Sequence, residues 1–193
     1  MTEIINTSLP IYSFSVASYH KLVDAGILKE DERVELIEGK IITMSPIRSP
    51  HAACVERLGY ILKQSLGKDV QIRAQNPITL GTHSEPEPDL AVVVFKKDFY
   101  EDAHPVPKDV FIAIEVSQST EKYDRNTKMP LYAKYGIAES WLVNLNKKEI
   151  EVYRNPSTEG YTSITVFGLK DKLKSGFLNP FSVKRAFKVK KSK

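Results

Sequence analysis

The sequence predicts an α/β fold of the α+β type, in which helices cover a central β-sheet. Two apolar runs, Leu90 to Val94 and Val110 to Val116, lack the polar alternation of a half-exposed strand. Such strands lie in the middle of a sheet that is covered on both faces. Apolar residues recur at helical spacing in Ser15 to Gly26 and in Ser49 to Gly67, which predicts two helices. The 193 residues, 41% of them hydrophobic, are expected to form one domain with a buried core.

The composition excludes several kinds of protein. Cys54 is the only cysteine, so an internal disulfide and a zinc site built from several thiolates are excluded, and a reducing compartment is expected. The N-terminal residues show no basic region followed by an apolar core, and no apolar run is long enough to span a membrane. We therefore expect a cytoplasmic protein that does not contact a membrane.

The charge balance is mildly basic, with a formal net charge of +4. The excess lies mainly in a C-terminal tail, residues 184–193, which is rich in lysine. Such a tail either contacts phosphates nonspecifically or is a solvated run that keeps the protein soluble. Both interpretations stay open.

A hairpin is predicted at Val34 to Ile42, with its turn at Glu38-Gly39, because glycine adopts the positive φ that a tight turn needs. Glu35 and Glu38 flank this turn. Each of them, taken alone, is best explained as an exposed hairpin charge.

Two further polar residues precede the central strands. Ser49 is expected to cap the second helix, which puts His51 in the first turn on the inward side, either as a hydrogen-bonded core residue or in a functional role. Val70 to Ala74 and Pro77 to Leu80 are strand-like. Gln75 between them either reaches a site or satisfies the local backbone.

The two central strands are expected to run antiparallel, because prolines in the loop from Phe95 to Asp109 argue against a crossover helix. In an antiparallel pair of strands the residue numbers of opposite residues add up to a constant. If Val94 pairs with Val110, that sum is 204, which places Asp89 opposite Glu115, on one face of the sheet. Two adjacent carboxylates repel each other, and a magnesium ion relieves that repulsion. In the alternative, Asp89 caps a turn and Glu115 pairs with a nearby base, Lys122 or Arg125.

A lysine is predicted to lie behind the carboxylate pair. The chain after Ser119 leads into a helix that ends near Gly136, with Asp124 or Thr127 as its cap. Lys128 shares a helix face with Leu131 and Tyr132, so it is expected to point toward the sheet or, in the alternative, to be an ordinary surface lysine. Three more strands are predicted after this helix, at Ser140 to Asn144, Glu149 to Arg154 and Tyr161 to Phe167, the second with one face in water.

Many blocks of this sequence, among them VELIEGKIITMSP, EPEPDLAVV, FIAIEVSQST and YDRNTKMPLYAKYGIAESWLVN, follow one another as they do in the Uma family. The chain resembles this restriction-endonuclease family of the PD-(D/E)XK nuclease superfamily from about residue 15 to about residue 161. The resemblance implies a mixed central sheet flanked by helices, with a restriction-endonuclease-like core. It also implies that Asp89 and Glu115 are metal ligands. Ser117 stands where the superfamily's usual lysine would be, and Lys128 fills the place of a lysine that has moved to the following helix.

The same resemblance places Glu35, Glu38, His51 and Gln75 near the site, and it implies an activity. Asp89, Glu115 and the backbone carbonyl of Val116 would bind Mg²⁺, with Mn²⁺ as a substitute, and Lys128 would act beside the metal. The expected reaction is hydrolysis of phosphodiester bonds, with DNA the favoured substrate. The alternative is a catalytically silent nuclease fold that binds nucleic acid or another protein. Analogy with enzymes that cut both strands at one place favours a homodimer.

Overall fold

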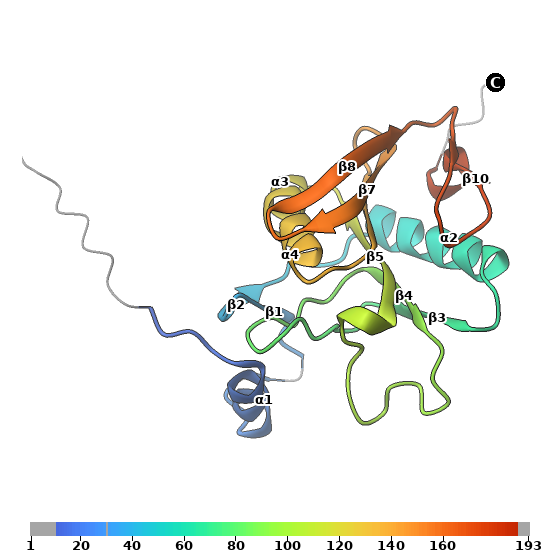
Figure 1. Ribbon diagram of the computed structural model, residues 1–193. Helices are drawn as coiled ribbons and strands as arrows, with labels where there is room; N and C mark the ends of the chain where they lie inside the picture. The colour runs from blue at the N-terminus through green and yellow to red at the C-terminus, as the bar shows by residue number, and fades with distance from the viewer. Residues whose placement is uncertain (1–10, 30, 189–193) are drawn as a thin grey trace, which may run out of the picture.

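A mixed six-stranded sheet forms the centre of the protein, in a computed structural model that describes residues 11–29 and 31–188. Only the central pair β5–β6 is parallel, and all other neighbours in the sheet are antiparallel (Figure 1). The order is β3 (Val70–Ala74), β4 (Leu90–Val94), β5 (Val110–Ser117), β6 (Glu139–Asn144), β7 (Glu149–Ser157) and β8 (Gly160–Phe167). The predicted mixed sheet flanked by helices is confirmed.

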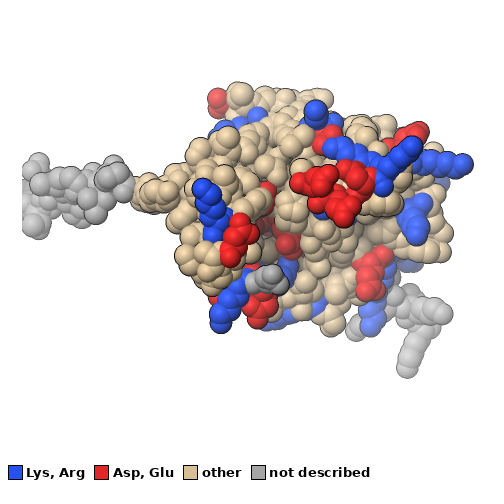
Figure 2. All heavy atoms as spheres, turned by 90° about the horizontal axis from the view of Figure 1, so that it is seen from below, with Lys and Arg blue, Asp and Glu red and all other residues tan. Residues whose placement is uncertain are grey.

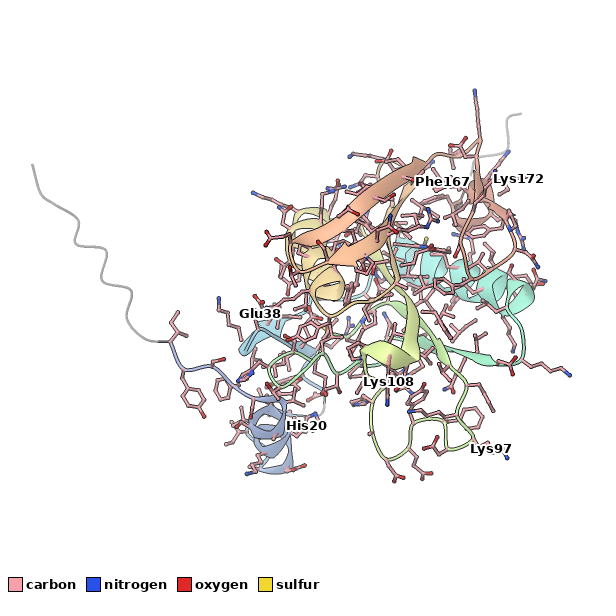
Figure 3. The ribbon with its side chains drawn as sticks, in the orientation of Figure 1. His20, Glu38, Lys97, Lys108, Phe167 and Lys172 are labelled. Carbon is pink, nitrogen blue, oxygen red and sulfur yellow. The ribbon has the colours of Figure 1, made fainter. Side chains whose placement is uncertain are left out.

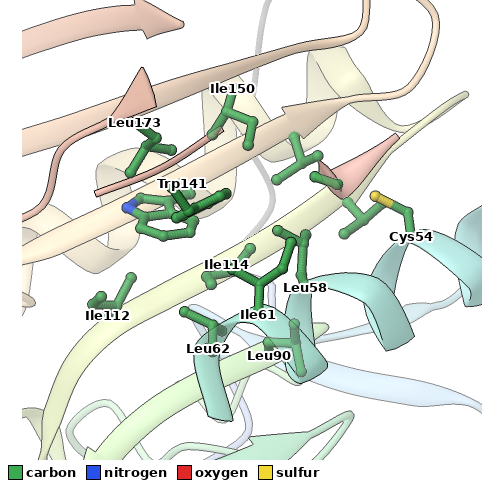
Figure 4. Close-up of a cluster of buried hydrophobic side chains, with 14 of the residues drawn as sticks. Cys54, Leu58, Ile61, Leu62, Leu90, Ile112, Ile114, Trp141, Ile150 and Leu173 are labelled. Carbon is green, nitrogen blue, oxygen red and sulfur yellow. The ribbon is translucent and has the colours of Figure 1, made fainter. Parts of the chain in front are cut away.

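Helices cover both faces of this sheet, as the apolar character of β4 and β5 predicts. On one face α2 (Ser49–Ser65) buries Leu58, Ile61 and Leu62 against Trp141 of β6 (Figure 4). On the other face lies a helical stretch formed by α3 (Glu121–Tyr123), the π-helical segment η2 (Asp124–Lys128) and α4 (Met129–Lys134). In the described part of the chain, no helix is both long enough and apolar enough to cross a membrane.

Smaller elements complete the fold. Before the sheet come α1 (Val16–Asp24), which Ser15 caps, and the hairpin β1 (Val34–Ile37) and β2 (Lys40–Thr43). The hairpin turn has positive φ at both Glu38 (46°) and Gly39 (76°), so the predicted turn is confirmed. The remaining elements are η1 (Pro107–Asp109), β9 (Lys172–Leu173), β10 (Phe181–Ser182) and η3 (Val183–Ala186).

The antiparallel pairing of β4 with β5 is confirmed, but the assumed Val94–Val110 contact is wrong. Val93 pairs with Val110, because an irregularity between Val92 and Val93 shifts the register by one residue. From Leu90 to Val92 the residue numbers of paired residues add up to 204, as in the pair Leu90–Ile114. The end of the strand pair nearest Asp89 therefore has the predicted register.

Several local predictions are corrected. Pro77 to Leu80 forms no strand, and Leu80 makes only an isolated bridge to Ser84. Ser49 is the first residue of α2 rather than its cap, and the side chain of Arg48 in the cap position accepts no hydrogen bond from the helix. The residues of β7 from Ile150 to Tyr153 are all buried, because the face that was expected in water is covered: Tyr153 packs with Met129 of α4, and Arg125 of η2 bonds Glu151.

The start of the predicted basic tail is anchored to the core. Lys184 and Arg185 belong to η3, whose Val183 and Ala186 are packed into the core cluster under α2, so the tail does not begin as a free solvated run. Residues 189–193 lie outside the described residues.

Candidate active site

A cleft of about 470 Å³ opens at the carboxyl end of β5. Its walls come from the β1–β2 hairpin, the start of α2, the residues before β4, and the α3–η2 helical stretch. Seven of the predicted residues line it: Glu35, His51, Asp89, Glu115, Val116, Asp124 and Lys128. Segments far apart in the sequence thus meet at one end of the sheet.

Asp89 is held by a set of hydrogen-bond donors. Its Oδ2 accepts from the backbone N–H of Val116 (2.8 Å) and from Nε2 of His51 (3.0 Å). The side-chain amide of Gln75 lies 3.4 Å from Oδ1. His51 and Gln75 therefore both lie beside Asp89, and these contacts fix the carboxylate against the end of β5.

Glu115 is a buried acid inside the most apolar strand of the sheet. Only 3% of its surface is exposed, and its Oε1 accepts from the Tyr132 hydroxyl (2.5 Å) and from Nζ of Lys128 (3.1 Å). Burial, together with the neighbouring carboxylates of Asp124, Asp89 and Glu35, raises the pKa of Glu115 well above its ordinary value, although Lys128 opposes this. The alternative pairing with Lys122 or Arg125 is wrong, since Lys122 is exposed and Arg125 binds Glu121 and Glu151 instead.

Lys128 points toward the sheet, as its helix face predicted. Its Nζ lies 2.9 Å from Oε2 of Glu35, 3.1 Å from Glu115 and 3.4 Å from the Glu87 carbonyl oxygen. Burial alone lowers the pKa of a lysine, but Glu115 and Glu35 outweigh it and raise the pKa of Lys128 above its usual range. The side chain is therefore a fixed ammonium at the inner wall of the cleft.

Of the remaining predicted residues, Asp124 lines the cleft and Glu38 lies outside it. Asp124 is interior to the helical stretch rather than its cap, and it accepts hydrogen bonds from the hydroxyls of Ser117 and Thr120. Glu38 is exposed at the hairpin turn (Figure 3), where it pairs with Lys134, so its expected place near the site is wrong. It projects from the turn, whereas Glu35 earlier in the same hairpin is buried in the cleft.

Sequence reasoning missed three contributors. Tyr132, four residues after Lys128 on the same helix face, orients Glu115, and that spacing was a usable signal. Tyr123, whose hydroxyl is 3.4 Å from Glu35, and Arg33, which pairs with Glu87 at 3.2 Å, gave no comparable signal. Their partners lie more than fifty positions away in the chain.

The donor set suits a hard divalent cation. Carboxyl groups outnumber cationic side chains in the cleft lining: five (Glu35, Glu87, Asp89, Glu115 and Asp124) against three (Arg33, Arg48 and Lys128). Among the described residues no group of three His, Cys, Asp or Glu side chains is arranged to hold a metal ion. Magnesium is usually held by one or two carboxylates and keeps several waters, so the pair Asp89 and Glu115 fits that ion.

Comparison with known proteins places the chain in a family. The model of the Uma2 family, described as "Putative restriction endonuclease", matches residues 16–183. The chain belongs to the Uma2 family. The predicted resemblance is thereby confirmed. Every residue of the cleft lies inside the matched range.

A solved structure supports the Uma2 fold. It is the crystal structure of a "putative nuclease belonging to DUF820" from Anabaena variabilis ATCC 29413, with a TM-score of 0.66 at 23% identity. The match covers 92% of this chain and 98% of the other. A search among curated proteins finds no match. Membership of the Uma2 family supports a nuclease function, and with it nucleic-acid binding.

Proposed function

We propose that this protein is a metal-dependent endonuclease that hydrolyses phosphodiester bonds, with DNA as the favoured substrate. One observation carries the proposal: the carboxylates of Asp89 and Glu115 and the ammonium of Lys128 line a single cleft. A metal-dependent nuclease uses a cation held by oxygen ligands and a positive group near the phosphate; the two carboxylates would hold the cation, and Lys128 would be the positive group.

Asp89, Glu115 and the carbonyl oxygen of Val116 would hold Mg²⁺, or Mn²⁺ in its place. When bound, the metal supplies an acidified water and stabilises charge on the phosphate oxygens. Val116 N–H and His51 orient the Asp89 carboxylate, and the Tyr132 hydroxyl orients Glu115. Lys128, fixed by Glu35, would orient the attacking water or neutralise charge on the phosphate.

Basic side chains at the cleft support a nucleic-acid substrate, and DNA is favoured because the family model describes a restriction endonuclease. Arg33 and Arg48 both line the cleft, and phosphate contacts of this kind position a nucleic-acid backbone without reading its sequence. On the face seen in Figure 2, basic and acidic side chains are interspersed, so that face offers no broad basic surface. We therefore expect modest affinity that falls with salt. A cytoplasmic location stays a prediction from the sequence.

The test compares nucleic acids and metals in one assay. The full-length protein is incubated with supercoiled plasmid, single-stranded DNA and RNA, in Mg²⁺, in Mn²⁺ and in excess chelator. Cleavage of DNA with either metal, and none with chelator, is the expected result. Faster cleavage of RNA would contradict the preference for DNA.

The Asp89→Ala variant is run beside the wild-type protein, and cleavage by it is expected to fall by at least about a hundredfold. Full activity of Asp89→Ala would overturn the assignment. Binding of DNA with no cleavage in any metal would instead support the alternative, a nuclease fold that binds nucleic acid without cutting it.

A further inference from the structure

The two edges of the sheet differ in how they are protected. The β3 edge is five residues long, carries Arg73, and is overlaid by the loop after β4. Arg73 there donates a hydrogen bond to the Phe99 carbonyl (3.2 Å), and its guanidinium lies 5.4 Å from the Tyr100 ring centroid. Short, charged and covered edges resist pairing with another chain.

The β8 edge has none of these protections. It is eight residues long, GYTSITVF, with no charged residue and no proline. Among the described residues only β7 pairs with it, and Figure 1 shows it at the rim of the sheet. Its outward backbone groups thus form a row that another strand can extend.

Exposed apolar side chains accompany that open edge. Ile164 is 56% exposed and Val166 is 54% exposed. They stand two residues apart, so they project from the same face of the strand, opposite Tyr153 and Glu151 of β7. An added strand would cover both.

We propose that two copies of this protein pair through β8, antiparallel about a two-fold axis, and join their six-stranded sheets into one. A second copy is the fitting occupant because an antiparallel strand edge is complementary to itself under a two-fold rotation. The strand carries no charge, so this pairing sets no like charges opposite each other. Any other partner would need an unpaired strand of its own.

Symmetry restricts the register of the pair. A two-fold axis perpendicular to the sheet keeps each side chain on its own face, so residues opposite each other must have indices of the same parity. A pairing centred on Ile164 sets Ile164 against Ile164 of the partner copy and Thr162 against Val166. The flanking charges Glu159 and Lys170 then meet the uncharged Leu169 and Thr158. This register is the one we adopt.

The interface is small. Eight residues a side fall well below the twenty to thirty of a standard interface, so we expect a dissociation constant on the order of micromolar or weaker. The dimer should therefore form and dissociate with protein concentration.

The pairing also sets where the two clefts lie, which matters if the proposed nuclease function holds. The strand pairings make β8 parallel to β5, so the partner's β5 runs in the opposite direction. The two clefts then face opposite ends of the joined sheet, seven strand spacings or roughly 34 Å apart. Such a dimer does not bring two sites to one point on a duplex.

Analytical ultracentrifugation of the full-length protein over a range of concentrations tests the pairing. In the Ile164→Lys variant, the lysines of the two copies would lie opposite each other at the β8 edge. The matched control is Tyr60→Lys on α2, because Tyr60 is 63% exposed and lies away from β8. Wild type and Tyr60→Lys should dimerise with rising concentration, while Ile164→Lys dimerises at least about tenfold more weakly. Equal melting temperatures would show that all three proteins fold alike. A wild type that stays monomeric, or an Ile164→Lys variant that dimerises normally, would overturn the proposal.

Disulfide cross-linking tests the register. Cys54 is 1% exposed, so one engineered cysteine is the accessible thiol among the described residues. Under mild oxidation Ile164→Cys should give a covalent dimer much faster than Tyr60→Cys. Equal rates at the two positions would mean random collision and would contradict the pairing. Both experiments omit metal and DNA, so their failure leaves the proposed nuclease function untouched.

Discussion

At the scale of single residues, the site is organised by Lys128. Its ammonium lies between Glu35 of the hairpin and Glu115 of the central strand, and all three side chains are almost completely buried. Buried charges are tolerated only when they are paired, so each of the three depends on the others. The same contacts hold the ammonium where a phosphate would approach.

Removal of the Lys128 charge should destabilise the protein strongly. The Lys128→Met variant leaves Glu35 and Glu115 without a cation, and we expect the free energy of unfolding to fall by about 3–5 kcal/mol. Urea unfolding measures it. The control is Lys134→Met, because the Lys134–Glu38 pair is exposed on both sides and its loss should cost less than about 1 kcal/mol. Equal losses in the two variants would mean that the buried pair is not the stabilising contact.

The single cysteine gives an independent test of the core. Burial raises the pKa of the Cys54 thiol to about 12, and its side chain lies on the face of α2 that packs into the core. At pH 8 the thiolate is then about one ten-thousandth of the thiol, and reagent has no access to it. We expect Cys54 to react with a thiol reagent only as urea unfolds the protein. Rapid stoichiometric reaction of the native protein would contradict the packing of α2.

At the scale of elements, the β1–β2 hairpin matters because it carries Glu35 into the cleft. Its turn packs closely on the chain before α1. A Cβ atom added to Gly39 would meet the side chain of Ser13 and would lie 3.1 Å from its Cα. The tight turn therefore has two requirements at this position, a positive φ and the absence of a side chain.

Gly39→Ala and Gly26→Ala separate these requirements. Both glycines have positive φ, at 76° and 67°, but an added Cβ at Gly26 meets nothing within 4 Å. Both variants should lose about 1 kcal/mol to backbone strain, and Gly39→Ala should lose at least about 1 kcal/mol more to overpacking. Thermal unfolding of the two variants measures the difference. Equal losses would mean that Ser13 moves away without cost.

The spacing of apolar residues along the sequence predicted some structural features well and others not at all. The apolar runs gave β4 and β5, and helical spacing gave the inward direction of Lys128. The register shift between Val92 and Val93 was invisible, because two identical valines carry no sign of which one leaves the regular pairing. The burial of Glu151 was missed for a similar reason: alternation describes a strand, whereas burial depends on the strand and helix that pack against it.

The site was predictable to the extent that its residues lie near one another in sequence or in the strand pairing. Asp89 and Glu115 follow from the register of β4 and β5. The Lys128–Glu35 contact does not, because the two residues are 93 positions apart and no periodicity links them. Glu38 was assigned to the site together with Glu35, yet the turn directs it to solvent.

At the scale of the whole molecule, the position of the cleft relative to the β8 edge determines whether the proposed cleavage cuts one DNA strand or both strands at a time. If two copies pair through β8, their clefts act far apart and each cuts one strand at a time. A supercoiled plasmid should then pass through a nicked circle before linear DNA appears, as a gel time course over several protein concentrations would measure. Linear DNA that appears with no nicked intermediate would contradict this arrangement.

The central claim is that Glu115 supports hydrolysis through its place in the cleft, and not only by being one of the buried glutamates of the sheet. Glu115→Gln and Glu151→Gln test it as a matched pair, because both are buried, ion-paired glutamates of strands β5 and β7 in the same sheet, and only Glu115 lines the cleft of Asp89 and Lys128. The decisive measurement is the rate of metal-dependent DNA cleavage by the wild type and by both variants. We predict that Glu151→Gln cleaves at the wild-type rate and that Glu115→Gln is slower by at least about a hundredfold. Wild-type cleavage by Glu115→Gln, or equal loss in both variants, would contradict the proposed site.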